Sequence, residues 1–526
     1  MRTRVLFLVL IISIALCPTT WAQRDAISIF GYQDSLSAGY GLSELDFSGR
    51  QAKLEYFGPS PRADKLYWMG EGSALSNPTG TLLLYSGGCD IREANGRQIP
   101  GTQPLVEDDL TLNCIASSMD RWPGEIILPA PDSWGDSVAY MLVHNLSIPG
   151  HDTTVKSTGV TALRVARRRG QYTLTERIPV GNHSSYASTQ MTAYPAPESI
   201  GGGWWLPLIE HDSNRWHMYR VAGVDESWTA FTSSTTGPKW RTSQIFENEI
   251  KFSPDGNFLA LNGGNPGLTI YDFNALTGSL NFLFTVPSLT PEETGYGGAA
   301  WSSNSRHLYF GCPEDSDAQV CVLDMNIARA SNDPSVAVTK IGRINSSEGI
   351  QYRNWPYAFG EMWLAPDCRI YVNPSASNFN IHIIEHPNRG GHDAGLVINA
   401  VDAPTRFSVD GFISFPNYRA TSGCDSTIAP IEGAISNNLD LDKPQTGLTI
   451  YPNPAGHFAT VGHLPTYAKV SLVGVSGETF MNLTPNNKTE RDLDLRRIPT
   501  GVYFVVVVDP ITKATESIRL VIGPEK

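Results

Sequence analysis

Charged residues are scarce in this chain. They make up 17% of its 526 residues, against about 25% in a typical soluble domain. The 52 acidic residues outnumber the 39 basic ones, which gives a formal net charge of −13. A chain with this acidic balance and no basic cluster is a poor candidate for binding nucleic acid or an anionic membrane. We therefore expect neither as a partner.

Long apolar runs are also missing, apart from one at the N-terminus. Val5–Cys17 follows Arg2 and Arg4, and Thr20 and Ala22 occupy the −3 and −1 positions of a cleavage site before Gln23. This run is too short to cross the roughly 30 Å core of a membrane as a helix. We expect residues 1–22 to be a signal peptide cleaved between Ala22 and Gln23, and no transmembrane segment after it.

Cysteines are few, and one of the seven, Cys17, belongs to the leader. An even number in an exported chain favours disulfide bonds. The chain has no C-x-x-C motif and no close grouping of Cys with His, so we expect no metal site and no cofactor. We expect nearest neighbours to pair, with one bond stapling a hairpin at 312–321; the six candidates are Cys89, Cys114, Cys312, Cys321, Cys368 and Cys424.

A polar turn followed by an apolar strand recurs along residues 23–424. Examples begin at Asn77-Pro78-Thr79-Gly80, Pro254-Asp255-Gly256 and Pro366-Asp367-Cys368. The spacing is about 58 residues, close to the period of a four-stranded propeller blade. An array of β-sandwiches would repeat about every 100 residues instead. The sequence predicts an all-β chain with a β-propeller of about seven blades at 23–424.

A propeller must also close its ring, because unpaired sheet edges promote aggregation. The strands around Ile27–Phe30 and Lys53–Tyr56 lack a complete blade, and Gly411–Phe415 comes last in the region. We expect these two ends to share one blade, and a Cys368–Cys424 bond to tie the exit segment to the penultimate blade.

Residues 425–446 lack apolar periodicity and contain Pro, Asn and Asp, as linkers do. Residues 447–526 then return to β patterns, and we expect a small β-sandwich there. Ala468, Val470 and Leu472 alternate with polar residues, the period of a half-buried strand. Tyr503–Val508 is continuously apolar, which is typical of a strand buried on both faces.

The C-terminal region resembles the type A sorting domain of the type IX secretion system. The matching segments are Leu448–Pro454, Val473–Gly477 and Ile498–Phe504, and the motif residues are Tyr451, Pro452, Asn453, Pro454, Gly477, Gly501 and Tyr503. The resemblance implies export by the type IX machinery, removal of the domain by its sortase, and either attachment to surface lipopolysaccharide or release. The expected location is secreted or cell-surface attached.

The larger region resembles secreted WD40-like propellers. Gly80–Cys89, Phe252–Leu259, Leu364–Tyr371 and Phe415–Tyr418 carry this resemblance. It supports the fold and implies no activity.

One stretch suggests an enzyme. Phe30–Gly41 is similar to the nucleophile block of GDSL-type esterases, with Ser35 as nucleophile. Gly263 or Gly264, Asn265, and His386 or His392 would then complete the site. However, Gln33 replaces a glycine of that motif, and the family needs alternating strands and helices that this chain does not show.

Other chemistry-bearing residues are scattered. His151-Asp152, His211-Asp212 and His392-Asp393 place a histidine beside an acid, as metal or acid–base sites can. Trp204, Trp205, Trp216, Trp228 and Trp240 would stack on sugar rings if exposed, or form blade core if buried. We therefore assign no catalytic residue and expect a non-catalytic propeller that binds a glycan or protein ligand. The alternative is a secreted hydrolase, either GDSL-like or a propeller enzyme.

Overall fold

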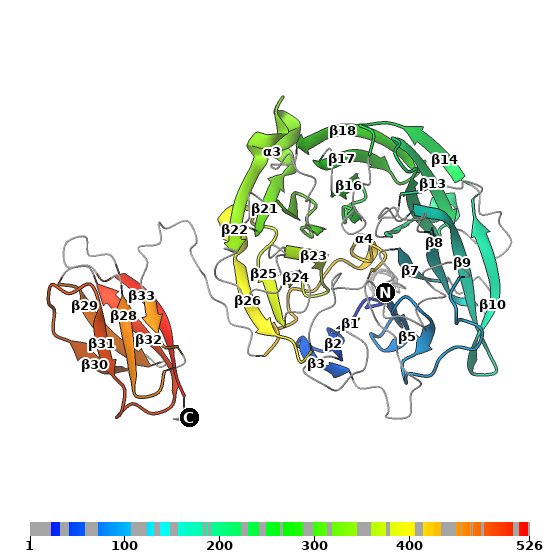
Figure 1. The fold of residues 1–526 in the computed structure, drawn as a ribbon. Helices are drawn as coiled ribbons and strands as arrows, with labels where there is room; N and C mark the ends of the chain where they lie inside the picture. Colours follow the sequence, from blue (N-terminus) through cyan, green and yellow to red (C-terminus); the bar gives the residue numbers. More distant parts are fainter. Residues whose placement is uncertain are drawn as a thin grey trace, which may run out of the picture. The chain divides into compact units, whose positions relative to one another are not determined.

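The computed structural model describes residues 23–523 except for 32–40, 58–71, 107–123, 131–136, 148–155, 182–185, 188–190, 222–229, 241–248, 264–266, 288–297, 313–317, 345–358, 375–378, 406–413, 433–448, 454, 463, 465–466, 475–477 and 509–514. The chain forms two compact units, residues 1–439 and 440–526. Within the described residues the first unit contains seven antiparallel sheets that follow one another around a ring (Figure 1). This unit is a β-propeller.

Each sheet is a meander of consecutive strands. Within the described residues the first two sheets have three strands each: β1 (Ile27–Gly31), β2 (Leu42–Asp46) and β3 (Lys53–Phe57), then β4 (Ser73–Ser76), β5 (Leu82–Ser86) and β6 (Ile91–Glu93). The third and fourth sheets comprise β7 (Glu125–Pro129), β8 (Ser137–Ser147), β9 (Lys156–Arg168) and β10 (Gln171–Val180), then β11 (Tyr194–Pro195), β12 (Trp204–Ile209), β13 (Arg215–Val221) and β14 (Ala230–Thr235).

The last three sheets of the ring also have four strands. They comprise β15 (Glu249–Phe252), β16 (Phe258–Asn262), β17 (Gly267–Asn274) and β18 (Ser279–Pro287); β19 (Ala299–Trp301), β20 (His307–Gly311), β21 (Ala318–Asp324) and β22 (Val338–Ile344); and β23 (Phe359–Leu364), β24 (Ile370–Pro374), β25 (Asn380–Ile384) and β26 (Leu396–Asp402). The first strands of neighbouring sheets contact one another, for example β15 with β19 and β19 with β23. These strands therefore lie nearest the axis of the ring.

The recurring turn joins the first and second strands of a sheet. At 253–257 the Asp255 carboxylate accepts hydrogen bonds from Ser253 Oγ (2.6 Å) and from the amide of Asn257 (3.1 Å). Gly256 has a φ of 68° there, a backbone conformation that glycine adopts at no steric cost. The turn at 302–306 repeats this pattern with Asn304 accepting the bonds and Ser305 at a φ of 58°.

The hydrophobic core lies between neighbouring sheets. Phe258, Ile270, Leu308 and Leu323, for example, bring the fifth and sixth sheets into one buried cluster. The ring closes in the same way, because Phe30 and Phe47 of the first sheet pack with Tyr371 and Ile383 of the last. Burial of this apolar surface is the main force that holds the ring together.

Closure of the ring differs from the expected shared blade. β1–β3 form a sheet of their own, and the only bridge from the C-terminal end that the described residues show is a parallel one between Gln51 and Ala429. Gly411–Ile413 lie outside the described residues, and Ser414 bonds beside β4 instead, where its amide donates to the carbonyl of Gly72 (2.8 Å).

The segment expected to begin a linker at 425 also packs on the propeller. Ile428 and Ile431 are 6% and 5% exposed and belong to the closing cluster. Both side chains pack between the first and last sheets, and this packing buries two isolated apolar residues. The compact propeller therefore continues beyond residue 424.

The C-terminal unit consists of two sheets around one core. The first contains β27 (Thr449–Tyr451), β28 (Phe458–Gly462) and β31 (Arg491–Asp494), and the second contains β29 (Lys469–Gly474), β30 (Thr479–Leu483), β32 (Gly501–Val508) and β33 (Thr515–Ile522). Both contribute to the core, for example Val461 and Leu493 from one and Val470 and Val505 from the other. The unit is a small β-sandwich.

The expectation that Tyr503–Val508 is buried on both faces is wrong. Within the unit Tyr503, Val505 and Val507 are buried, whereas Phe504 on the other face is 37% exposed. Only one face of β32 meets the other sheet, so only alternate residues are covered.

Candidate functional site

The axis of the propeller is the first place to look for a site. Residues 414–423, which include the short helix α4 (Arg419–Ser422), run near the centre of the ring (Figure 1); we call them the axial segment. Asn417 fastens it by donating from Nδ2 to the carbonyls of Phe252 (2.9 Å) and Ser253 (3.1 Å). The backbone amide of Asn417 donates to the carbonyl of Ala193 (2.7 Å).

Aromatic and ionic contacts extend this anchorage around the ring. Phe415 stacks on Trp363 of the last sheet with ring centroids 5.2 Å apart. Tyr418 meets the edge of Trp204 in the fourth sheet at 5.9 Å. Arg419 forms an ion pair with Asp25, which precedes β1. The axial segment therefore occupies space in which an open propeller would offer a channel.

A small pocket remains between the axial segment and the inner strands β15, β19 and β23. Its lining includes Lys251, Trp301, Glu361, Phe415 and Arg419. The cavity volume is about 80 Å³, which is room for a few water molecules. Pockets that enclose drug-sized ligands usually measure roughly 300–1,000 Å³. The volume of this pocket is therefore well below that range.

The inner strands that line this pocket also approach one another closely. The buried Glu249 carboxylate accepts hydrogen bonds from the amides of Ala299 and Met362, and so joins three sheets. Burial raises its pKa, and Lys251 Nζ, 3.9 Å away, partly offsets that effect. The amide of Gly298 donates to the carbonyl of Gly360 at 3.0 Å. These contacts hold the inner strands together, which is a structural role.

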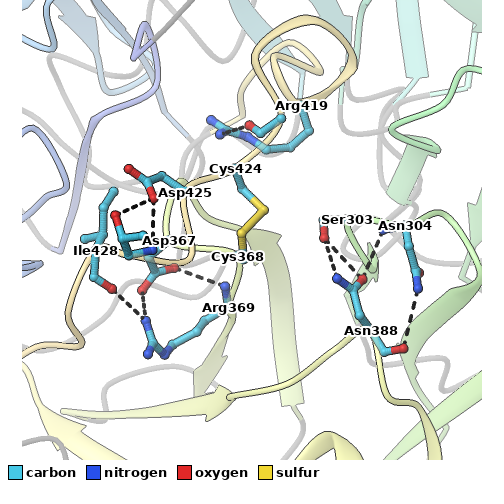
Figure 2. The surroundings of a disulfide bond; sticks show 12 residues. Ser303, Asn304, Asp367, Cys368, Arg369, Asn388, Arg419, Cys424, Asp425 and Ile428 are labelled. Carbon is cyan, nitrogen blue, oxygen red and sulfur yellow. Dashed lines mark hydrogen bonds and ion pairs between the residues drawn. A yellow bond between two sulfur atoms is a disulfide. The ribbon is translucent and has the colours of Figure 1, made fainter.

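The Cys368–Cys424 disulfide anchors the end of the axial segment to the last sheet (Figure 2). Beside it, buried Asp367 pairs with Arg369 Nη1 at 3.1 Å, and the same nitrogen donates to the carbonyl of Ile428 at 3.3 Å. Burial raises the pKa of Asp367 against the opposing effect of Arg369. The bond therefore lies within a network that fixes the exit of the chain from the propeller.

The other expected cysteine pairs fit the fold to different extents. Cys312 and Cys321 are bonded and staple the β20–β21 hairpin. Cys89 is also disulfide-bonded, whereas Cys114 lies outside the described residues.

Among the described residues, the esterase candidates that can be placed do not come together. Ser35, Gly264 and Asn265 lie outside the described residues. Gly263 follows β16 and lies on the face of the propeller where β15 and β19 begin. The exposed His386 and His392 lie in the connection between β25 and β26. Asn388 of this connection bonds to the 302–306 turn (Figure 2), which lies on the opposite face of the propeller from Gly263.

The other candidate residues from the sequence do not form a site among the described residues either. Trp204, Trp205, Trp216 and Trp240 are at most 1% exposed, so they form blade core and cannot stack on a sugar. Trp228 and His151-Asp152 lie outside the described residues. His211 and Asp212 contact each other at 3.3 Å in the β12–β13 turn, and His392-Asp393 lies in a short 3-10 turn. In the part of the chain that the structure describes, no three His, Cys, Asp or Glu side chains gather to hold a metal ion.

One constellation in the fourth sheet was not predicted. The buried His217 ring contacts Ser233 Oγ through Nδ1 at 2.9 Å and Glu210 Oε1 through Nε2 at 2.8 Å. Ser233 lies directly opposite His217 on the edge strand β14 and is exposed. These three residues form no recognisable sequence motif. Only the register of the paired strands brings them together, so the sequence alone did not reveal the constellation.

Motif residues of the C-terminal unit tie its first strand to its last. Asn453 Oδ1 accepts a hydrogen bond from the amide of Val521 at 2.9 Å. The Tyr503 hydroxyl donates to the carbonyl of Pro499, two residues before Gly501, at 2.8 Å. Pro454, Gly477 and the cleavage residue Ala22 lie outside the described residues, and Gln23 is the first described residue.

Residues 449–522 match the family model of the secretion system C-terminal sorting domain. The C-terminal unit belongs to this family. The protein is thus a β-propeller sorted by the type IX secretion system, and its location is secreted or cell-surface attached. Among the described residues no helix has the length and apolarity needed to cross a membrane.

Solved structures similar to the chain have low sequence identity. A putative 6-phosphogluconolactonase from Bacteroides uniformis is 10% identical, covers 73% of this chain and 97% of its own, and gives a TM-score of 0.35. PorZ of the Porphyromonas gingivalis type IX secretion system is 12% identical, with coverages of 94% and 85% and a TM-score of 0.20. TolB from Acinetobacter baumannii is 11% identical, with coverages of 95% and 83% and a TM-score of 0.25. None of the curated proteins compared with this sequence matches it.

Proposed function

We propose that this protein is a non-catalytic binding protein that recognises a glycan or protein ligand outside the cell. The sorting domain delivers the propeller to the cell surface or beyond. In this proposal the sortase removes the domain, and the propeller is then attached to surface lipopolysaccharide or released.

The filled axis is the observation that carries this proposal. Propeller enzymes need space for a substrate beside converging polar groups. Among the described residues, the axial segment and the close inner strands leave a pocket of about 80 Å³ between them. Recognition therefore falls to the outer surface, where a propeller presents loops from all its blades.

The test is a binding and activity screen on the signal-cleaved chain. We expect retention on a defined subset of a glycan array, or saturable capture of one surface protein, together with no turnover of ester or glycoside substrates. Turnover of any substrate with Michaelis kinetics, abolished by one point substitution, contradicts the non-catalytic assignment.

A hydrolase is the second candidate, and Ser233, His217 and Glu210 are the observation that favours it. In such an enzyme Ser233 Oγ bonds to the carbonyl carbon of an ester and its proton passes to His217 Nδ1. The ester C–O bond then breaks, the proton passes from His217 to the alcohol that is expelled, and Glu210 stabilises the imidazolium in between. Water finally hydrolyses the acyl group from Ser233, with His217 accepting the proton of the water and returning it to Ser233 Oγ.

An active-site serine probe separates the two candidates. If the protein is a hydrolase, a fluorophosphonate labels Ser233, and Ser233→Ala or His217→Gln abolishes labelling. Ser234→Ala is the matched control on the neighbouring position of β14. Absence of labelling in the folded wild type removes this candidate.

A further inference from the structure

The β9–β10 hairpin ends in three consecutive exposed arginines, Arg167, Arg168 and Arg169. Arg168 pairs with Gln171, so Arg169 and Gly170 alone form the turn. Their φ values are 50° and 82°, as in a two-residue type I′ turn. Such turns favour Asn, Asp or Gly at the first position, and arginine is costly there. A residue that its backbone position does not favour points to a role for the side chain.

This tip contrasts with the charge of the whole protein. Residues 161–180 contain five arginines and one glutamate, a net charge of +4 in a chain of net charge −13. The expectation that the chain lacks a basic cluster is therefore wrong. The net negative charge of the whole chain does not reveal this local run of arginines, three of which the hairpin places at its tip.

Two further arginines of the hairpin contact structural partners away from the tip. Arg164 lies 3.6 Å from Glu176, and Arg177 donates to the carbonyls of Gly101, Pro104 and Leu105. At the tip, the Arg167 guanidinium lies 5.4 Å above the ring of Tyr172. That contact fixes the direction of Arg167 and leaves its planar donor edge for an anion.

We propose that this tip binds an acidic polysaccharide through its carboxylate, sulfate or phosphate groups. The proposal rests on the ligand-binding function proposed above and names the chemical class of its ligand. Guanidinium groups pair with such oxyanions through two parallel hydrogen bonds, and three arginines in succession can engage charges along one chain.

Features of the tip favour a glycan over nucleic acid. Single-stranded nucleic acid sites combine basic residues with exposed aromatic rings on which bases stack. Here the aromatic residue, Tyr172, is 9% exposed and lies beneath Arg167. The export signal places the hairpin where surface polysaccharides are found.

The experiment measures binding of the signal-cleaved full chain to polygalacturonate and dextran sulfate, with uncharged dextran as reference. R167Q/R168Q/R169Q should weaken binding to the acidic polymers at least about tenfold. The control K239Q/K340Q/R343Q removes the same charge from exposed positions on other strands and loops and should change binding less than about twofold. Binding should also weaken as salt is raised.

Further arms separate the possible failures. Equal denaturation midpoints show that the variants are folded, and R167K/R168K/R169K distinguishes paired guanidinium bonds from charge alone, with partial recovery expected. Equal binding by wild type and R167Q/R168Q/R169Q overturns the inference, as does equally tight, arginine-dependent binding of a DNA strand. Wild-type binding to a neutral glycan or a protein, but to no acidic polymer, overturns the inference and leaves the proposed function intact. No binding to any glycan or protein overturns both.

Discussion

Asp25 and Arg419 lie 394 positions apart in the chain and form a buried ion pair beside the propeller axis. Their side chains are 3% and 8% exposed. One residue precedes the first strand of the ring, and the other belongs to the axial segment that follows the last sheet. The pair therefore joins the two ends of the propeller near its centre, in addition to the apolar closing cluster between the first and last sheets.

Asp25→Asn should destabilise the propeller strongly, because it leaves the Arg419 charge buried without its partner. Removal of one member of a buried pair typically costs about 3–5 kcal/mol. A urea titration followed by tryptophan fluorescence measures the change. Arg97→Ala breaks a pair in which the arginine is 51% exposed, and it should cost less than about 1 kcal/mol. Similar midpoints for both variants would contradict the closing role of Asp25.

The two described disulfides should contribute unequally. Cys368–Cys424 closes a loop of 56 residues and Cys312–Cys321 a loop of 9. Chain-entropy arguments give about 4 kcal/mol for the longer loop and about 2.5 kcal/mol for the shorter. We expect C368S/C424S to lower the unfolding midpoint more than C312S/C321S does. The opposite order would show that the exit of the chain is held without the covalent bond.

Glu44 predicts a pH dependence of stability. Burial, then Asp46 and then the cross-strand neighbour Glu55 raise its pKa from 4.5 to about 7. The native state therefore holds this proton more tightly than the unfolded chain does. Stability contributed by Glu44 is full below about pH 4.5 and is lost as the pH rises through about 7.

Glu44→Gln should accordingly stabilise the propeller at pH 8, by about 1–2 kcal/mol after allowance for partial exposure, and change little at pH 4.5. Denaturation curves at the two pH values provide the measurement. Glu55→Gln, at an exposed position, removes only one of the three causes and should give a smaller gain. A gain for Glu44→Gln that is equal at both pH values would contradict the assignment.

Gly298 tests how closely the inner strands must approach. A Cβ at this position would overlap the backbone of Glu361 and Met362 in β23. Gly298→Ala should therefore separate β19 from β23 and cost about 3 kcal/mol, as overpacking in a tight core does. Gly49→Ala is the control, because its nearest atom would be 3.6 Å away. Equal stabilities would show that the inner strands shift at little cost.

The sequence predicted the propeller because the signal is local. Each turn such as Pro254-Asp255-Gly256 forms its own hydrogen bonds within five residues, so it can be recognised without its neighbours. The sorting domain could be recognised for the same reason, because its Asn453 and Gly501 lie in short sequence motifs. In contrast, closure by Ile428 and Ile431 depends on two isolated apolar residues in a polar stretch, which periodicity cannot detect.

The candidate sites were harder to predict for the same physical reason. His217 meets Ser233 only because β13 and β14 pair in one particular register. The tryptophans at 204, 205, 216 and 240 could be read as core or as a sugar platform until burial was known. Arg167–Arg169 became a patch only when the two-residue turn brought them to the hairpin tip.

The last prediction concerns the C-terminal unit. We expect residues 447–526 to serve transport alone, so that their deletion leaves a folded propeller in the periplasm. The propeller's closing cluster ends with the buried Ile431, and the sorting domain begins at 449, so processing between them leaves both cores intact. The secreted species should therefore retain Asp425–Ile431 and lack Tyr503–Ile522, and a matched deletion from 425 should destabilise the propeller because it removes Ile428 and Ile431. Mass spectrometry of the surface or culture-fluid protein decides this, and full recovery of Tyr503–Ile522 peptides would show that the domain stays attached.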